Sequence, residues 1–339
     1  MRRFFLTLIL LAALAALGLG AAGLWWVQQP LKLPAPTVDL SVEPGTTPRG
    51  VAQAVADTGT DVPPQLLYWW FRFSGQDRQI RAGSYELERG ITPHLLLNML
   101  VRGEEATRSV VLVEGWNFRQ VRSALAKAEQ LKPDTYGLSD EEVMTRLGRP
   151  GVHAEGRFFP DTYTYSKGSS DVALLQRAMR SMDKKLDAAW AARASTLPLK
   201  TAEEALILAS IVEKETGAAK DRAEVAAVFT NRLRVGMPLQ TDPTVIYGLG
   251  TRFDGNLRKK DLQTDTPWNT YTRPGLPPTP IAMPGKAALL AAVQPAPSKS
   301  LYFVSRGDGS SHFSTSLEEH NRAVNRYQRS ADPNQRSGQ

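Results

Sequence analysis

The hydrophobic positions of this chain form one long run near the N-terminus and shorter periodic stretches after it. Residues 4–27 contain a single polar side chain, Thr7, and about 20 consecutive apolar residues are enough for a helix to cross a bilayer. Two arginines precede the run without an opposing acid, and two tryptophans stand where such a helix would leave the hydrocarbon. The pattern predicts a transmembrane anchor at 1–28, with the N-terminus in the cytoplasm and the rest exported.

A cleaved signal peptide is the alternative interpretation of this run. Gly20-Ala21-Ala22 offers small residues that a signal peptidase could accept. The run is longer than the usual apolar core of a signal peptide, about 7–15 residues, which favours a retained anchor. Both interpretations place the body of the protein outside the cytoplasm.

A proline-rich segment follows at 29–37. Pro30, Pro34 and Pro36 lack amide donors and favour extended backbone. We predict that this segment is a stiff spacer, which would lift the first folded module off the membrane.

The next part of the chain repeats a strand–turn–helix pattern. A Gly-x-Thr-Pro element ends a short β-type stretch at Gly45–Pro48 and again at Gly90–Pro93, 45 residues later, and an apolar-periodic stretch follows each. Glycine permits the positive φ of the turn, threonine can cap a helix, and proline fits the first helical position. A looser third copy lies at 111–118. Residues 38–108 are therefore predicted to form a small α+β module.

After this module, helical and strand patterns are mixed. Asp171–Trp190 has apolar residues three to four positions apart, and it predicts a helix capped by Asp171. Alternating residues at 301–304 and again at 312–314, joined by a turn, predict a hairpin.

The predicted fold class is α+β, with a transmembrane helix, a small α+β module and a larger mixed α+β catalytic domain. The predicted parts are the anchor at 1–28, the spacer at 29–37, the small module at 38–108, the larger region at 109–328 and a polar tail at 329–339.

One apolar helix in the larger region ends in two carboxylates. Thr201 and Glu204 match a capping box at its start, and Gly217 is placed to end it. Between Ala205 and Val212 every position except Ser210 is apolar, so the helix is predicted to be buried. Its last turn holds Glu213 and Glu215.

A helix C-terminus is an unfavourable place for a purely structural carboxylate. This end of a helix carries partial negative charge, and burial also disfavours the charged form. Both effects raise the pKa toward neutral pH, where a protonated acid can donate to a leaving group. Glu213 and Glu215 project about 200° apart on a helix, so they do not easily share one site. Geometry leans slightly to Glu215, and pairing of both glutamates with a nearby base on a solvated helix end is the alternative.

Composition limits the other chemistries that this chain can support. It has 41 Lys and Arg against 34 Asp and Glu, a net charge of +7, without the long basic run that favours nucleic-acid binding. It has no cysteine, which excludes disulfides, thiol catalysis and iron–sulfur clusters. Its four histidines form no pair of the H-E-x-x-H type. We expect no metal, no organic cofactor and no nucleic-acid partner.

The carboxylate-bearing helix belongs to a series of motifs. In chain order these are Glu155–Tyr163, Ala209–Thr216, Val228–Leu233, Leu239–Gly248, Asn269–Tyr271 and Gly275–Pro278. Together they resemble the endolytic murein transglycosylase family, the YceG-like proteins, over the chain from the anchor to about Tyr327. Thr279 is a departure, because glycine is common there in that family, but the glutamate motif is intact. The glycine–threonine turns of 38–108 resemble a LysM-like module, a fold associated with N-acetylglucosamine polymers.

The resemblance implies a lytic transglycosylase that cleaves peptidoglycan glycan strands without consuming water. It places the catalytic acid/base at Glu215, the second glutamate of the E-K-E-T motif. It also implies a single-pass protein of the cell inner membrane with a periplasmic catalytic region, and contact with a peptidoglycan synthase is a family-level expectation. The candidate substrate-binding residues lie in the surrounding motifs: Glu155, Gln240, Asp242, Asn269, Thr270 and Tyr271.

Five of the six substrate-binding candidates also have a structural alternative, and that of Glu155 is to anchor the turn that follows it. Asp242 can simply start a turn, Asn269 and Thr270 can cap backbone groups, and Tyr271 can be a core residue with a satisfied hydroxyl. Two other functions stay open. One is a non-catalytic envelope scaffold that binds glycan through the small module, and the other is a hydrolase that adds water.

Overall fold

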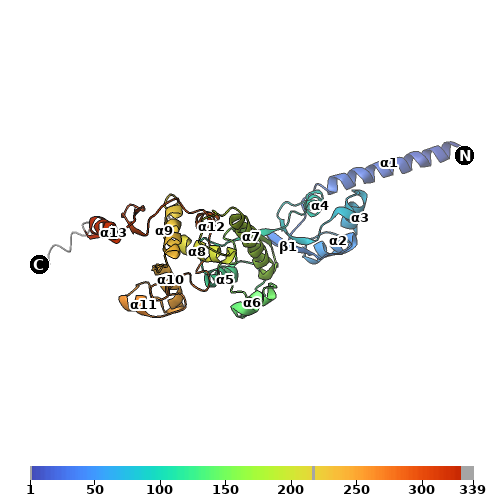
Figure 1. Cartoon of the computed structure of the whole chain (residues 1–339). Helices are drawn as coiled ribbons and strands as arrows, with labels where there is room; N and C mark the ends of the chain where they lie inside the picture. The colour runs from blue at the N-terminus through green and yellow to red at the C-terminus, as the bar shows by residue number, and fades with distance from the viewer. Residues whose placement is uncertain (1, 216–217, 330–339) are drawn as a thin grey trace. The chain divides into compact units, whose positions relative to one another are not determined.

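The computed structural model describes residues 2–215 and 218–329 (Figure 1). Helices and three two-stranded sheets make up these described residues, which confirms the predicted α+β class. The chain separates into two compact units. Unit 1 is Met1–Arg108 with Thr164–Ser169, and unit 2 is Ser109–Tyr163 with Ser170–Gln339.

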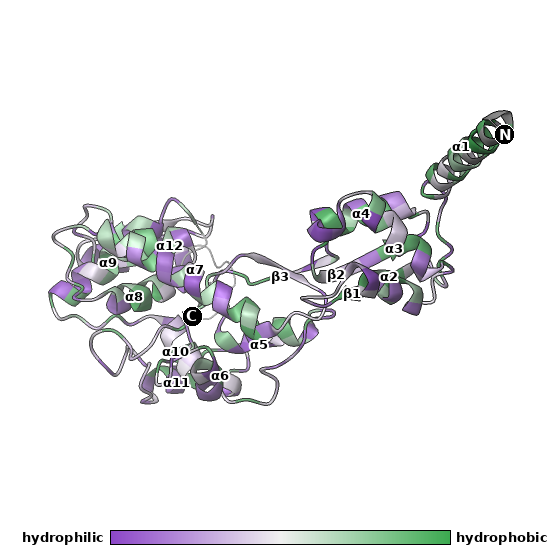
Figure 2. Ribbon diagram, turned by 90° about the vertical axis from the view of Figure 1, so that its right-hand side faces the viewer, coloured by the Kyte–Doolittle hydropathy of each residue, from purple (hydrophilic) through white to green (hydrophobic). Residues whose placement is uncertain are grey.

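The first helix, α1 (Arg2–Trp26), occupies the predicted anchor. Its stretch Leu6–Trp26 has a mean hydropathy of 2.2, and none of it is buried. Apolar residues cover the helix along most of its length (Figure 2). The helix is long and apolar enough to cross a bilayer, although a signal sequence would have the same properties.

The predicted spacer packs on unit 1 instead of standing clear of it. Leu31 of this segment is 7% exposed and belongs to the hydrophobic core of the unit, and Val27, just before the segment, is 5% exposed. The N–H of His94 donates to the carbonyl of Val27 at 3.0 Å, and the N–H of Leu31 donates to the carbonyl of Ile91 at 2.8 Å. The prolines keep this segment extended, but the leucine between them gains more by burial than by remaining in solvent. The chain therefore enters the core of unit 1 directly after α1.

Unit 1 packs helices and one strand pair around a shared core. Its two strands pair antiparallel, with Thr37 opposite Glu88 and Val42 opposite Gly83. Alternate strand residues face the helices and are buried, as the period of two predicts. The elements are β1 (Thr37–Val42), α2 (Pro48–Asp57), α3 (Pro64–Phe73), η1 (Asp77–Gln79), β2 (Gly83–Glu88) and α4 (Pro93–Arg102).

The recurring turn of unit 1 forms as the sequence predicts. Gly45 and Gly90 have φ angles of 85° and 96°, which glycine adopts without the strain of a Cβ atom. The hydroxyls of Thr47 and Thr92 accept from backbone N–H groups at 3.1 and 3.2 Å. A proline begins the helix in both cases, so the cap and the proline specify the same N-terminus for α2 and for α4.

The third copy of the turn leads into unit 2. Gly115 has a φ of 77°, and Asn117 forms a reciprocal capping box at the start of α5 (Phe118–Lys127). Before this turn, β3 (Thr107–Val111) pairs with β4 (Thr162–Ser166). The chain passes from unit 1 to unit 2 along β3.

Unit 2 is built around α8 (Ala202–Glu215). Every residue of Ala205–Val212 is buried, as predicted, and α7, α9, α10 and α12 pack against this helix (Figure 1). Gly217, which was predicted to end it, and residues 330–339 of the predicted tail lie outside the described residues. The other elements are α6 (Asp140–Arg146), α7 (Asp171–Ala191), α9 (Arg222–Arg234), α10 (Asp242–Leu249), η2 (Gly250–Arg252), α11 (Lys259–Gln263), α12 (Lys286–Val293), β5 (Tyr302–Ser305), β6 (Ser311–Ser314), α13 (Leu317–Val324) and η3 (Asn325–Arg329).

Helix ends in unit 2 show where local prediction succeeds and fails. The predicted hairpin is the antiparallel pair β5–β6, and the Thr201 hydroxyl accepts from the N–H of Glu204 at 3.1 Å. The prediction that Asp171 caps α7 is wrong, because Ser170 is the cap and Asp171 is the first helical residue. The Asp171 carboxylate instead accepts from the N–H and hydroxyl of Thr135. This partner is distant in the sequence, so helix signals alone could not identify it.

Candidate active site

The carboxyl group of Glu215 is the centre of the candidate site. It lies in the last described turn of α8, where the side chain is only partly exposed. Thr241, the N-cap residue of α10, donates its hydroxyl to Oε1 of Glu215. A buried helix thus carries the carboxyl to the start of a second helix, and the threonine restrains its orientation.

The surroundings of Glu215 raise its pKa above the ordinary value of a glutamate. Burial is the main cause, because it penalises the charged form. The hydrogen bond from Thr241 lowers the pKa, the charge of Asp242 raises it and the charge of Arg232 lowers it. The net direction is upward, so more of this side chain is protonated near neutral pH than in an exposed glutamate.

Glu213 lies two residues earlier and has a structural partner. Its Oε2 accepts from the N–H of Gly285 at 2.9 Å, and Arg222 lies 4.0 Å from its Oε1. Gly285 is the N-cap of α12, so the carboxylate meets the positive end of that helix. Burial raises the pKa of Glu213 as well. The pKa of Glu213 and the pKa of Glu215 are both raised, so the direction of the shift does not distinguish the two residues. Their hydrogen-bond partners do.

Two loops are tied together beside the Glu215 carboxyl. The backbone N–H of Gln240 donates to the carbonyl of Thr270 at 3.2 Å. The N–H of Thr241 donates to Oγ1 of Thr270 at 3.1 Å. The Tyr271 hydroxyl donates to Oδ1 of Asp242, the first residue of α10, at 2.6 Å. These contacts bring four of the predicted residues, Gln240, Asp242, Thr270 and Tyr271, to one end of α10.

Three of these residues present polar groups that solvent can reach. Gln240 and Asp242 are exposed and Tyr271 is partly exposed. Gln240 has a φ of 47°, an uncommon conformation for a residue with a Cβ atom that recurs at ligand sites. Burial and the neighbouring Asp242 raise the pKa of Tyr271, so its hydroxyl keeps its proton and can act as a donor.

Asn269 and Thr270 are fully engaged inside the loop. They are 0% and 2% exposed. The Asn269 amide donates to two backbone carbonyls at 3.0 and 2.7 Å and accepts from the N–H of Tyr271 at 2.9 Å. The hydroxyls of Thr270 and Thr244 lie 2.8 Å apart. Both predicted residues therefore shape the loop that carries Tyr271.

Glu155 is separate from the cluster around Glu215. Its side chain is 3% exposed, and both carboxylate oxygens accept from the N–H of Phe118, at 3.0 and 3.2 Å. Burial raises the pKa of Glu155 to about 7, and hydrogen bonds from Phe118 and Tyr247 oppose this rise. Since Tyr247 belongs to α10, the buried carboxyl joins the start of α5 to the helix that begins beside Glu215.

Two residues that the sequence analysis did not select also contribute to the site, Thr241 and Arg232. Arg232 is 8% exposed. Its guanidinium donates to the carbonyls of Leu239 at 2.6 Å and Leu301 at 2.7 Å, and its charge acts on Glu215. The sequence signal for Arg232 was its position between apolar residues of a helix. An arginine there is buried, and a buried guanidinium requires specific partners.

The arrangement suits proton transfer by a carboxyl group. Glu215 can give up a proton, and the Thr241 hydroxyl and the nearby guanidinium favour the carboxylate that remains. Within residues 2–215 and 218–329, no three side chains among His, Cys, Asp and Glu are grouped as metal ligands would be. The absence of a metal or cofactor stays a prediction.

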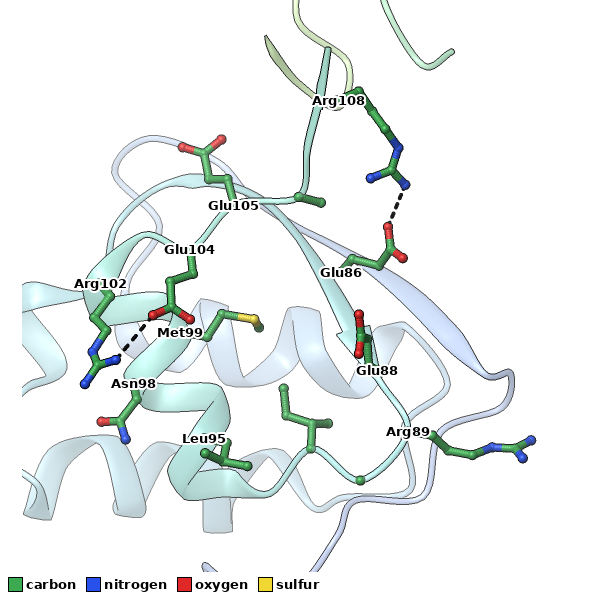
Figure 3. Close-up of a pocket in the computed structure, with 13 residues that line it drawn as sticks. Glu86, Glu88, Arg89, Leu95, Asn98, Met99, Arg102, Glu104, Glu105 and Arg108 are labelled. Carbon is green, nitrogen blue, oxygen red and sulfur yellow. Dashed lines mark hydrogen bonds and ion pairs between the residues drawn. The ribbon is translucent and has the colours of Figure 1, made fainter. Parts of the chain in front are cut away.

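Unit 1 contains a separate pocket of about 690 Å³ (Figure 3). Charged side chains of both signs line it, and two pairs form there: Arg108 with Glu86 at 2.8 Å and Arg102 with Glu104 at 3.4 Å. Apolar side chains of α4 line it as well. None of the residues drawn around this pocket is aromatic.

Comparisons with known proteins agree on one family. A family model described as the YceG-like family matches residues 40–326. A protein from Bacillus subtilis (strain 168) named endolytic murein transglycosylase is 28% identical over 308 residues, which cover 86% of this chain and 85% of that protein. A protein of the same name from Streptococcus pneumoniae is 27% identical over 280 residues, which cover 72% of this chain and 50% of that protein. The crystal structure of a YceG-like protein from Listeria monocytogenes covers 85% of this chain and 98% of its own, with a TM-score of 0.54 and 26% identity.

Proposed function

This chain belongs to the YceG-like family and is an enzyme of the lytic transglycosylase type, a lyase, and we propose that it cleaves peptidoglycan strands from the outer side of the inner membrane. The family model covers most of the chain, and the two relatives named endolytic murein transglycosylase support the activity. The bond proposed for cleavage is the β-1,4 bond between N-acetylmuramic acid and N-acetylglucosamine. Cleavage within strands, and termination of nascent strands, are part of this proposal.

The proposed mechanism uses Glu215 as acid and then as base. The protonated carboxyl gives its proton to the glycosidic oxygen while the bond from that oxygen to C1 of the muramic residue breaks. The 6-hydroxyl of the same sugar attacks C1, and the Glu215 carboxylate takes the hydroxyl proton. A 1,6-anhydro ring forms, no water is consumed, and the carboxyl returns to its protonated state. One carboxyl serves both steps, so the paired carboxylates of ordinary glycosidases are not needed.

Neighbouring groups have complementary roles in this mechanism. The hydroxyl of Thr241 and the charge of Arg232 stabilise the carboxylate that exists between the two proton transfers. Asp242 and Tyr271, joined by a 2.6 Å hydrogen bond, offer a negative charge and an oriented hydroxyl to a positively charged sugar transition state. Gln240 is assigned to substrate contact because it is exposed beside them.

One observation carries the proposal more than any other. The Glu215 carboxyl stands at the end of a buried helix, its pKa is raised by burial, and a hydroxyl from a second helix holds it. Glu213 accepts directly from a backbone N–H at a helix N-terminus and lies 4.0 Å from an arginine, as expected of a structural carboxylate, whereas the direct partner of Glu215 is a side-chain hydroxyl. Glu215 instead has the properties of a proton donor.

The proposed location follows from α1. We assign the protein to the inner membrane with a single span, a cytoplasmic N-terminus and the catalytic region in the periplasm. The apolar stretch Leu6–Trp26 is long enough to span a bilayer, and the positive-inside rule places the preceding Arg2 and Arg3 in the cytoplasm. A synthase that makes the glycan strand is a proposed partner.

We assign glycan contact to the small module of unit 1 as a second part of the proposal. The sequence likeness to a LysM-like module supports it, and the pocket on β2 and α4 offers charged groups that can bond sugar hydroxyls (Figure 3). Loss of strand binding in the variant Glu88→Ala/Arg89→Ala, with cleavage of short fragments retained, is the expected result.

The experiment that tests the enzymatic function is an analysis of reaction products. Full-length protein in detergent is incubated with purified peptidoglycan, and the released ends are identified by mass spectrometry. We expect 1,6-anhydromuramic ends. Reducing muramic ends would instead indicate a hydrolase that adds water, and binding without new ends would indicate the non-catalytic scaffold.

The variant Thr241→Val is expected to change the pH dependence of this cleavage. Loss of the hydroxyl removes an interaction that favours the Glu215 carboxylate, so the pKa of Glu215 rises further. The alkaline limb of the rate profile should move to higher pH, and the maximal rate should fall about tenfold because the carboxyl loses its restraint.

Two further variants control this measurement. Thr241→Ser should restore the wild-type profile. Thr230→Val is the matched control, since Thr230 is a buried threonine whose hydroxyl donates to two backbone carbonyls of its own helix, α9, at 2.9 and 3.0 Å. If the Thr241→Val profile coincided with that of Thr230→Val, Thr241 would have no role in tuning Glu215.

A further inference from the structure

One face of α3 in unit 1 exposes large apolar side chains. Leu66, Trp69 and Phe73 are 48%, 50% and 79% exposed. Their spacing of three and four residues places them on the same side of the helix. The rings of Trp69 and Phe73 stack at 5.5 Å with 20° between their planes. The opposite face of α3 is fully buried through Leu67 and Phe71, so the exposed face is not needed for the core.

This exposed face, which we call the α3 face, lies on a helix that contacts the same turn as the end of α1. The indole of Trp70 donates to the carbonyl of Pro93 at 3.0 Å, and its ring lies 6.2 Å from that of His94. The N–H of His94 in turn donates to the carbonyl of Val27, the residue after α1. The first turn of α4 therefore connects α3 to the point where the chain leaves α1.

α1 runs directly into the packed part of unit 1. α1 ends at Trp26, and Val27 is already 5% exposed within the unit. Trp26 itself packs against the core cluster of unit 1, and Trp25 is 66% exposed. If α1 crosses a bilayer, these tryptophans stand at the headgroup level, the usual depth of interfacial aromatics. The adjoining surface of unit 1 must then lie at the same level.

We propose that the α3 face inserts into the outer surface of the bilayer that α1 spans, so that unit 1 has a second contact with lipid; this rests on the membrane anchoring proposed above. Stacked aromatic and leucine side chains on one helix face are typical of interfacial helices. Arg72, next to Phe73, pairs with Asp77 at 3.0 Å and can keep its charge in the headgroups while its stem lies along apolar surface. The three side chains of the α3 face carry no charge, and the indole N–H of Trp69 is their one polar group, which suits lipid better than a hydroxyl-rich sugar.

The absence of cysteine from the natural sequence makes this contact directly measurable. Gln65 is exposed, lies next to Leu66 and leaves the α3 face intact when replaced. The full-length variant Gln65→Cys is labelled with an environment-sensitive fluorophore and placed in vesicles of phosphatidylethanolamine and phosphatidylglycerol. Nitroxide-bearing lipids in these vesicles should reduce its emission about twofold or more, because the label lies at interfacial depth.

Two backgrounds make the test specific. Trp69→Ser/Phe73→Ser should markedly reduce the quenching, because the α3 face no longer inserts, while the protein still floats with the vesicles through α1. Val235→Ser/Leu317→Ser replaces residues of similar exposure in unit 2, 64% and 56%, and should leave the quenching unchanged.

The outcomes separate this proposal from those on which it depends. Flotation without quenching would overturn the lipid contact and leave the anchor in place. A label insensitive to lipid but responsive to added glycan strands would also overturn it and identify the α3 face as a sugar platform. Loss of flotation by the wild type would remove the anchor, and the lipid contact with it. Product analysis reports on catalysis independently of all three results.

Discussion

Glu215→Gln is expected to reduce cleavage by on the order of 10³-fold or more. Glutamine keeps the shape of the side chain and can still accept the hydrogen bond from Thr241. It cannot give a proton to the glycosidic oxygen, and it cannot take one from the 6-hydroxyl, so both proton transfers of the proposed mechanism fail. The measurement is the rate of 1,6-anhydromuramic end formation by the full-length protein, with the unfolding midpoint recorded alongside it.

Glu213→Gln is the matched control on the same helix. Glu213 accepts from the N–H of Gly285, and the glutamine oxygen can keep this bond, so activity should stay within about tenfold of wild type. No loss of stability is expected at neutral pH, because burial raises the pKa of Glu213 and the neutral amide therefore suits this position at least as well as the charged carboxylate. If Glu213→Gln were inactive and Glu215→Gln active, the assignment of the acid would have to be reversed.

The pH dependence of the wild type provides a second check on the same residue. The pKa of Glu215 is raised, and the mechanism starts from its protonated form. Cleavage should therefore decline as pH rises through that pKa. An enzyme that needs an ionised nucleophile at its first step loses activity when that group is protonated at low pH. Here the rate of cleavage at low pH should not depend on ionisation of Glu215.

Local signals in the sequence predicted much of the fold. The glycine, threonine and proline of the repeated turn act within a few residues of one another, so the starts of α2 and α4 could be read directly. The burial of the middle of α8 could also be predicted, since Ala205–Val212 contains only one polar residue, Ser210. The helix starts and the burial of α8 depend on residues close together in the sequence, so the sequence alone was enough to predict them.

Features that depend on distant partners were not predictable in the same way. Asp171 looked like a helix cap, but its carboxylate is used by Thr135 from another part of unit 2. The proline-rich segment looked like a spacer, yet Leu31 is buried in unit 1. Thr241 was passed over although its hydroxyl reaches Glu215. In each case the deciding contact joins residues whose proximity only the tertiary structure establishes.

The candidate site combines both kinds of information. The motif resemblance selected Glu215, and helix chemistry alone left it nearly equal to Glu213. The contacts supply the distinction, since Glu213 is tied to α12 and Glu215 is held by a hydroxyl beside exposed polar residues. Asn269 and Thr270 belong to the scaffold of this site, because their polar groups are used within the loop.

The buried carboxyl of Glu155 predicts a pH effect on stability. Its pKa is raised to about 7 in the folded protein from an ordinary value of 4.5. Below about pH 4.5 both folded and unfolded chains hold the proton, so its favourable contribution is complete. As the pH rises from there to about 7, the unfolded chain releases the proton and the folded chain keeps it. Stability from this group therefore falls with pH, by about 3 kcal/mol in total.

Glu155→Gln should remove this loss, because the amide does not ionise and can still accept from the N–H of Phe118. Relative to wild type, the variant's unfolding temperature should rise by about 5–10 °C between pH 5 and pH 8, measured by calorimetry in detergent. Tyr247→Phe should instead extend the loss of stability to higher pH, since the Tyr247 hydrogen bond lowers the pKa of Glu155 and its removal lets that pKa rise further. If the unfolding temperatures of wild type and Glu155→Gln changed with pH in parallel, the folded protein would ionise this carboxyl at its ordinary pKa. The contact of Glu155 with α5 and α10 would then need a charged partner that the described contacts do not supply.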